Sequence, residues 1–170
     1  MVENQKLIIT TQRTILRLIN EDDLDDIAAL NLDPEVRKFF PGGIQNREQT
    51  KQRMKEFMNF YKQYGLPCFV IIDKISNAFI GRCGFGPISS EDIEVGYLIS
   101  RKYWGQGYAS EVLQALLKWS KSNIKNEYII AFAPLKHHAA HRVMEKCDMQ
   151  FYKEDIGHGL ECKFYRIENN

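Results

Sequence analysis

A turn with two glycines is the part of the chain best suited to binding a charged ligand. It lies between a strand predicted at 93–99 and a helix predicted to begin at Gly107, so its backbone N–H groups have no intrahelical partner. Glycine lets the main chain approach a ligand closely, and the helix dipole favours negative charge there. The predicted anion-binding residues are Trp104, Gly105, Gln106, Gly107, Tyr108, Ala109 and Ser110, with Arg101 and Lys102 as nearby cations.

Two common nucleotide motifs are absent from this turn. Ser110 stands where G-x-G-x-x-G requires its third glycine, and the chain has no G-x-x-x-x-G-K-[ST] sequence. The pattern therefore disfavours NAD and ATP as ligands. A short G-x-G also occurs where only the geometry of a turn requires glycine, so a purely structural turn is the alternative.

The elements around the turn indicate an α/β (α+β) fold. Apolar spacing predicts about four helices, of which one has an Asn46–Gln49 capping box and ends at Gly65. Helices interposed late among meandering strands favour a three-layer domain with a mixed, mostly antiparallel central sheet. We expect residues 1–170 to form a single domain. About seven strands are predicted: 13–19, 67–73, 78–85, 93–99, 127–133 and two between 150 and 167.

Composition and charge disfavour several classes of partner. The 170 residues carry 23 Lys+Arg against 22 Asp+Glu, a net charge of +1 that gives no reason to expect nucleic acid. No apolar run reaches membrane-spanning length and residues 1–6 lack a signal-peptide layout, so a cytoplasmic protein without membrane contact is expected. The pattern carries no signal for an oligomeric state. Four isolated cysteines are expected to be reduced thiols: Cys68, Cys83, Cys147 and Cys162.

The strand and the glycine turn together resemble the GNAT acetyltransferase superfamily. The matching segments are Ile93–Ile99 and Tyr103–Glu111. The segment Thr11–Arg17 and the acidic residues 21–23 are similar to the opening of the branch that contains ribosomal-protein N-terminal acetyltransferases. The resemblance spans nearly the whole chain. It implies an enzyme that moves an acetyl group from acetyl-CoA to a primary amine, on a protein N-terminus or a small molecule, by direct attack on the thioester.

The same resemblance implies where acetyl-CoA binds. The turn from Gly105 to Ser110 would bind the pyrophosphate, and the backbone of Leu98 and Ile99 would pair with the pantetheine arm. The physical chemistry is compatible, because a helix N-terminus suits a pyrophosphate and an extended amide-bearing arm suits an open sheet edge.

Glu94 is the candidate catalytic base. Acyl transfer needs a neutral amine, so a group must remove a proton from the ammonium, directly or through water. Glu94 lies two residues before Gly96, on the strand expected beside the thioester. The alternative is an exposed carboxylate or an ion-pair partner. No general acid is assigned, because Met144 stands where the resemblance would place a tyrosine, and a backbone N–H is expected to stabilise the oxyanion.

Three positions depart from the family pattern. Trp104 stands where the turn usually begins with Gln or Arg, and Asp148 replaces a glycine after the last helix. Where the family has Asn-x-x-Ser, the chain has His137 and Ala140, so His137 is expected to hydrogen-bond the pantetheine arm while Ala140 offers no hydroxyl. His137 and His141 are spaced i, i+4, but no third ligand is in view and no metal is expected.

The segment from Phe39 to Gly43 is the predicted acceptor-side loop. Its glycines allow motion, and the resemblance places it between the first two helices, over the acceptor. We predict a lid that carries Phe39 and Phe40, with a hydrophobic anchor as the alternative reading. The sequence is compatible with three functions: an N-acetyltransferase, a regulatory module that binds acyl-CoA with little or no catalysis, and a protein that binds a different anion.

Overall fold

The computed structural model describes residues 6–89 and 91–170, so the expectation about residues 1–6 falls almost wholly outside it. Within the described residues, eight strands form one sheet in the order β1-β2-β3-β4-β5-β6-β8-β7. Their bounds are β1 (Ile8–Thr10), β2 (Thr14–Leu18), β3 (Cys68–Asp73), β4 (Phe79–Pro87), β5 (Ile93–Ile99), β6 (Tyr128–Pro134), β7 (Gln150–Gly157) and β8 (Leu160–Glu168). The extra strand is β1, whose three residues are too few for an alternation signal.

In the described part of the chain, four α-helices accompany the sheet, as the apolar spacing predicts. They are α1 (Leu24–Leu32), α2 (Arg47–Tyr64), α3 (Tyr108–Asn123) and α4 (His138–Lys146), with short 3-10 turns η1 (Glu21–Asp23) and η2 (Arg101–Tyr103). The predicted capping box of α2 is confirmed, because Asn46 and Gln49 exchange side-chain-to-backbone hydrogen bonds of 2.8 and 2.9 Å. Gly65 ends this helix with a left-handed φ of 66°.

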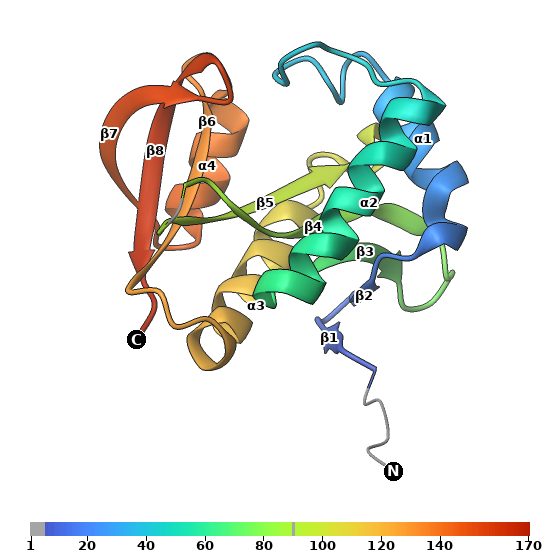
Figure 1. Cartoon of the computed structure of the whole chain (residues 1–170), viewed down its shortest axis with the longest axis horizontal. Coiled ribbons are helices and arrows are strands. Elements are labelled where there is room, and N and C mark those ends of the chain that lie inside the picture. The colour runs from blue at the N-terminus through green and yellow to red at the C-terminus, as the bar shows by residue number, and fades with distance from the viewer. Residues whose placement is uncertain (1–5, 90) are drawn as a thin grey trace.

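The predicted three layers are confirmed. On one face of the sheet, Ile27 of α1 and Met54 of α2 pack with Val70. On the other face, Val112 and Leu116 of α3 belong to a larger buried cluster. Figure 1 shows the sheet between these two helical layers. Among the residues described, no helix is both long and apolar enough to cross a membrane.

The sheet opens between its two halves. β4 and β5 pair antiparallel along the whole length of β5, from Ile93 to Ile99. β5 and β6 are parallel and share only one pair, Glu94 with Ile130, and they diverge beyond it (Figure 1). Because β6 continues the sheet with β8 and β7, this divergence leaves a gap in the middle of the sheet, with backbone groups of β5 along one side.

Candidate functional site

A cleft of about 1300 Å³ occupies the gap between β5 and β6. Its walls come from the α1–α2 loop, α2, β4, β5, the start of α3, the β6–α4 connection, α4 and the β7–β8 turn. Arg101, Lys102 and Gln106 do not belong to its lining. The cleft brings together twelve of the residues that the sequence singles out: Phe39, Phe40, Glu94, Leu98, Ile99, Trp104, Gly105, Gly107, Tyr108, Ala109, Ser110 and His137.

The glycine turn has the geometry of an anion-binding loop. Gly105 and Gly107 have φ values of 71° and 83°, a left-handed conformation that costs residues with a Cβ roughly 1–2 kcal/mol. The first bond of α3 is donated by Glu111 N–H to the Gly107 carbonyl at 3.1 Å. The N–H groups of Tyr108 to Ser110 precede that bond, so they have no partner within the helix. They are free to bind an anion.

Arg101 and Lys102, the two cations next to the turn in the sequence, do not line the cleft. Arg101 forms an ion pair with Asp33, with Nε 3.2 Å from the carboxylate, and Lys102 lies over the Tyr103 ring at 5.1 Å. The Gln106 side chain donates to the Lys102 carbonyl at 3.0 Å. These contacts hold the predicted residues on the outer side of the turn, away from the cleft lining.

Arg13 is a cation at the turn that the sequence pattern missed. Its guanidinium lies 3.9 Å from the centre of the Tyr108 ring, and its Nη2 atom would be 3.5 Å from a Cβ added to Gly107. Its Nε is 2.9 Å from Glu111, whose carboxylate also accepts hydrogen bonds from Thr11 and from Arg13 N–H. Arg13 therefore offsets the negative charge that Glu111 places near the start of α3.

Helix α4 contributes two further cations to the cleft. Arg142 and Lys146 are exposed, are four residues apart and both line the cleft. Residues at this spacing lie on one side of a helix. Together with Arg13, which lies beside the turn but is not part of the cleft lining, they give the end of the cleft near the glycine turn a positive character suited to phosphate groups.

The free edge of β5 can be read from its pairing with β4. Ser100 N–H donates to the Ile80 carbonyl at 2.8 Å, and backbone groups alternate in direction along a strand. The groups of Leu98 therefore face β4, whereas those of Tyr97 and Ile99 face the gap. The Trp104 indole donates to the Ile99 carbonyl at 2.9 Å, which fixes the turn to the end of the strand. Leu98 contributes its side chain, which packs in a small cluster with Leu30 and Val36.

Glu94 lies where β5 and β6 part, since it forms their single residue pair. Its Oε1 atom is 3.1 Å from Nε2 of His158, which comes from the β7–β8 turn. This hydrogen bond is the main cause that raises the pKa of His158; burial opposes it, and the negative charge of Glu94 adds to it. The His158 ring also lies 5.0 Å from that of Phe132. Glu94 thus lines the cleft and has His158 as a hydrogen-bond partner that can carry a proton. No local sequence pattern indicates this pairing.

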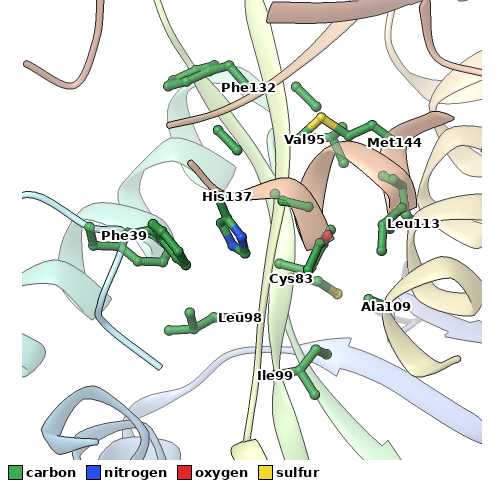
Figure 2. A pocket seen from close by; sticks show the side chains of 18 of the residues that line it. Phe39, Cys83, Val95, Leu98, Ile99, Ala109, Leu113, Phe132, His137 and Met144 are labelled. Atoms are coloured by element: carbon green, nitrogen blue, oxygen red, sulfur yellow. The ribbon is translucent and has the colours of Figure 1, made fainter. Parts of the chain in front are cut away.

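Phe39 and His137 meet across the cleft. Their rings stack with centroids 4.1 Å apart and 13° between their planes, and Figure 2 shows the two side chains facing one another. Burial, together with the nearby His141 and His138, lowers the pKa of His137 to about 4, so its ring is neutral at neutral pH. Phe40 instead packs beside Leu30, Val36 and Leu98. Phe40 is therefore an anchor, while its neighbour Phe39 reaches over the cleft.

His141 and the four cysteines are buried. Within residues 6–89 and 91–170 no three His, Cys, Asp or Glu side chains are grouped to hold a metal ion, and the ring of His141 is 3.2 Å from the Ala133 carbonyl. The four cysteines are free and buried. Burial raises the pKa of Cys83, which lines the cleft, so its thiol stays protonated and is a poor nucleophile.

Met144 occupies the position where the family resemblance would place a catalytic tyrosine. Met144 is 4% exposed and lines the cleft, where Figure 2 shows it beside Val95 and Leu113. A thioether has no proton to give, so Met144 cannot act as a general acid. This wall of the cleft is apolar.

Comparison with known proteins assigns the chain to a family. The acetyltransferase (GNAT) domain family matches residues 13–150. The uncharacterized N-acetyltransferase YnaD of Bacillus subtilis (strain 168) is 29% identical over 157 residues, which cover 90% of each chain.

Two solved structures share the fold. A GNAT-family acetyltransferase from Bacillus anthracis is 27% identical, with a TM-score of 0.82 over 96% of this chain and 99% of that one. RimL, a ribosomal alpha-N-protein acetyltransferase solved with coenzyme A, is 16% identical, with a TM-score of 0.82 over 95% of this chain and 98% of that one. With its family match over residues 13–150, the chain belongs to the GNAT acetyltransferase family and is an acetyl-CoA-dependent N-acetyltransferase.

Proposed function

We propose that acetyl-CoA lies along the open edge of β5. Its pyrophosphate accepts hydrogen bonds from the N–H groups of residues 105–110, with Arg13, Arg142 and Lys146 around it. Its pantetheine arm runs beside Tyr97 and Ile99, and the neutral ring of His137 faces the same space. The thioester then lies near Glu94, five residue steps or about 17 Å along the strand from Ile99. The observation that carries this proposal is the single β5–β6 pair, which leaves the edge open as far as Glu94.

In the proposed reaction, Glu94 removes a proton from the acceptor ammonium, directly or through one water. The neutral amine attacks the thioester carbonyl, and a backbone N–H on the open side of β5 stabilises the oxyanion. The C–S bond then breaks, the nitrogen loses its second proton to give the neutral amide, and the departing CoA thiolate takes up that proton. His158 accepts the hydrogen bond of the protonated Glu94 and, being half exposed, passes the proton to solvent.

The acceptor in this proposal is a primary amine, on a protein N-terminus or a small molecule. It enters from the side of α1 and α2, where Phe39 covers the cleft and Phe40 holds the loop. We propose further that residues 1–170 work as one domain, which the continuous sheet from β1 to β8 supports. A cytoplasmic location is proposed because acetyl-CoA is the co-substrate.

Release of free thiol tests the proposed function. The protein is mixed with acetyl-CoA and a panel of primary amines, and the acetylated product is identified by mass spectrometry. We expect turnover with at least one acceptor. Protection of the fold by CoA against heat, without turnover of any acceptor, would instead support a regulatory acyl-CoA-binding module. Equal protection by CoA and by inorganic phosphate would point to a general anion site.

A further inference from the structure

Three arginines lie on the acceptor side of the cleft. Arg37 comes from the α1–α2 loop, Arg53 from α2 and Arg82 from β4, and all three line the cleft. The guanidinium groups of Arg53 and Arg82 lie 4.7 and 5.0 Å from the centre of the Phe57 ring. That of Arg37 lies 4.5 Å from the Phe40 ring. Three positive charges therefore converge under the loop that carries Phe39.

Carboxylates compensate only part of this charge. Arg53 forms an ion pair with Glu56 at 2.6 Å, whereas Arg37 donates its Nε–H to the Gly43 carbonyl at 2.9 Å. In the described part of the chain, the buried Nε of Arg82 has no hydrogen-bond partner. Burial, followed by the charges of Arg82 and Arg53, lowers the pKa of Arg37 to about 10. A buried cation without a partner is costly, and a bound anion would remove that cost.

An open path connects these arginines with Glu94. Across β4 and β5, Arg82 pairs with Leu98 and Gly86 pairs with Glu94. Residues directly opposite share a face of the sheet, so Arg82 and Glu94 lie on the same face, four residues or about 13 Å apart along the strands. Gly96 lies between them on β5 and Gly86 lies beside Glu94 on β4, and a Cβ added to either glycine would meet nothing within 4 Å. The floor between the arginines and Glu94 is therefore free of side chains at these positions.

We propose that the acceptor is an amine that carries an anionic group, a carboxylate or a phosphate. Arg82, with Arg37 and Arg53, holds the anion, and the amino group reaches Glu94 across the glycine floor. This inference rests on the proposed function and adds the chemical class of the acceptor. Guanidinium groups bind carboxylate and phosphate oxygens through paired N–H donors, which fixes the orientation of the amine as well as its charge preference.

Matched pairs of acceptors test the charge preference. ω-Amino carboxylates of increasing chain length are compared with their amides, and aminoalkyl phosphates with the corresponding amino alcohols. We expect kcat/KM to favour the anionic member by roughly tenfold or more, because a neutral analogue leaves the arginines without a partner. The carboxylate and phosphate arms show which anion the site prefers. Equal kcat/KM values within both kinds of pair would overturn the inference.

Three variants locate the preference in the cleft. Arg82→Gln should raise the KM of the anionic acceptor about 10- to 100-fold toward that of its neutral analogue, with the KM for acetyl-CoA little changed. Arg53→Gln, at a more exposed position, should also raise the KM of the anionic acceptor. This variant replaces Arg82→Gln in the test if Arg82→Gln does not fold. Arg47→Gln is the control, because Arg47 is exposed on α2, pairs with Asp25 and does not line the cleft. Unchanged selectivity in both cleft variants would also overturn the inference.

Failure of the proposed function would look different. No thiol release with any amine, neutral ones included, would refute catalysis but leave the anion site open to a binding test. In that case the aminoalkyl phosphates and amino carboxylates should still protect the wild-type fold against heat, and protect Arg53→Gln and Arg82→Gln less. Absence of this protection would refute the anion site as well.

Discussion

Replacing Glu94 with Gln is the sharpest test of the proposed chemistry. The substitution removes the negative charge and the capacity to take up a proton, yet it keeps the shape of the side chain and an oxygen that can accept from His158, 3.1 Å away. The residue lies at the only β5–β6 pair, about 17 Å along the strand from Ile99 and the glycine turn. The change should therefore affect the reacting end of the cleft and leave the pyrophosphate end intact.

The expected loss can be estimated from general base catalysis. A positioned base contributes about 10²–10⁴ in rate, or roughly 3–5 kcal/mol of barrier at 1.36 kcal/mol for each factor of ten. The imidazole of His158, next to Glu94, offers a second proton acceptor in the variant. We therefore expect the lower end of this range, a fall in kcat of about 100-fold, with the KM for acetyl-CoA little changed.

The measurement is the initial rate of thiol release at saturating acetyl-CoA and acceptor. Glu91→Gln is the matched control, because Glu91 is an exposed carboxylate three residues before Glu94 that does not line the cleft. Its kcat should equal that of the wild type. An unchanged kcat in Glu94→Gln would refute Glu94 as the base, and a rise in the KM for acetyl-CoA as large as the fall in kcat would refute the proposed position of the thioester.

Three further predictions concern the turn and two histidines. Gly107→Ala places a Cβ at φ 83°, which introduces a strain of about 1–2 kcal/mol. Relief of that strain rotates the N–H groups of the turn away from the anion. CoA binding measured by calorimetry should therefore weaken roughly 5- to 30-fold. Burial lowers the pKa of His137 to about 4. The contribution of His137 to the stability of the fold is therefore fully present above its ordinary pKa and is lost as pH falls toward 4. In thermal melts, the stability of His137→Asn should depend less on acid pH than that of the wild type. Glu94 is the chief cause that raises the pKa of His158. The contribution of His158 to the stability of the fold is therefore present below its ordinary pKa and is lost as pH rises through the raised value. In Glu94→Gln, the midpoint of the His158 titration measured by NMR should move to lower pH.

Each of these predictions has its own contradicting result. Gly65→Ala adds a Cβ at a comparable φ of 66° outside the cleft, so it should cost stability alone, and equal CoA affinities of the two glycine variants would exclude a role for the turn. An unchanged acid sensitivity in His137→Asn would show that other groups cause it. An unmoved His158 titration in Glu94→Gln would mean that the two side chains do not interact in solution.

Much of the fold and half of the site depend on local sequence. The capping box of Asn46 and Gln49, the left-handed Gly65 and the glycine turn involve residues within a few positions of each other, where types and spacing decide the conformation. These features were predictable for that reason. The short strand β1 was not, because three residues paired at the sheet edge carry no periodicity of their own.

The other half of the site depends on contacts between distant segments. Glu94 and His158 are 64 positions apart, and Arg13 reaches Glu111 across 98 positions, so no local pattern relates them. Proximity in the sequence does not fix the direction of a side chain: Arg101 adjoins the glycine turn, yet it pairs with Asp33 and is not part of the cleft lining. The arginines under the acceptor loop come from three separate elements, and only the folded sheet and helices bring them together.

Backbone amide shifts in an NMR titration with acetyl-CoA show whether this ligand binds from the glycine turn along β5. We expect the largest shifts at residues 105–110, followed by Tyr97 and Ile99, with α1 (Leu24–Leu32), none of whose residues lines the cleft, little affected. Large shifts confined to other elements, with residues 105–110 unmoved at saturation, would contradict this mode of binding.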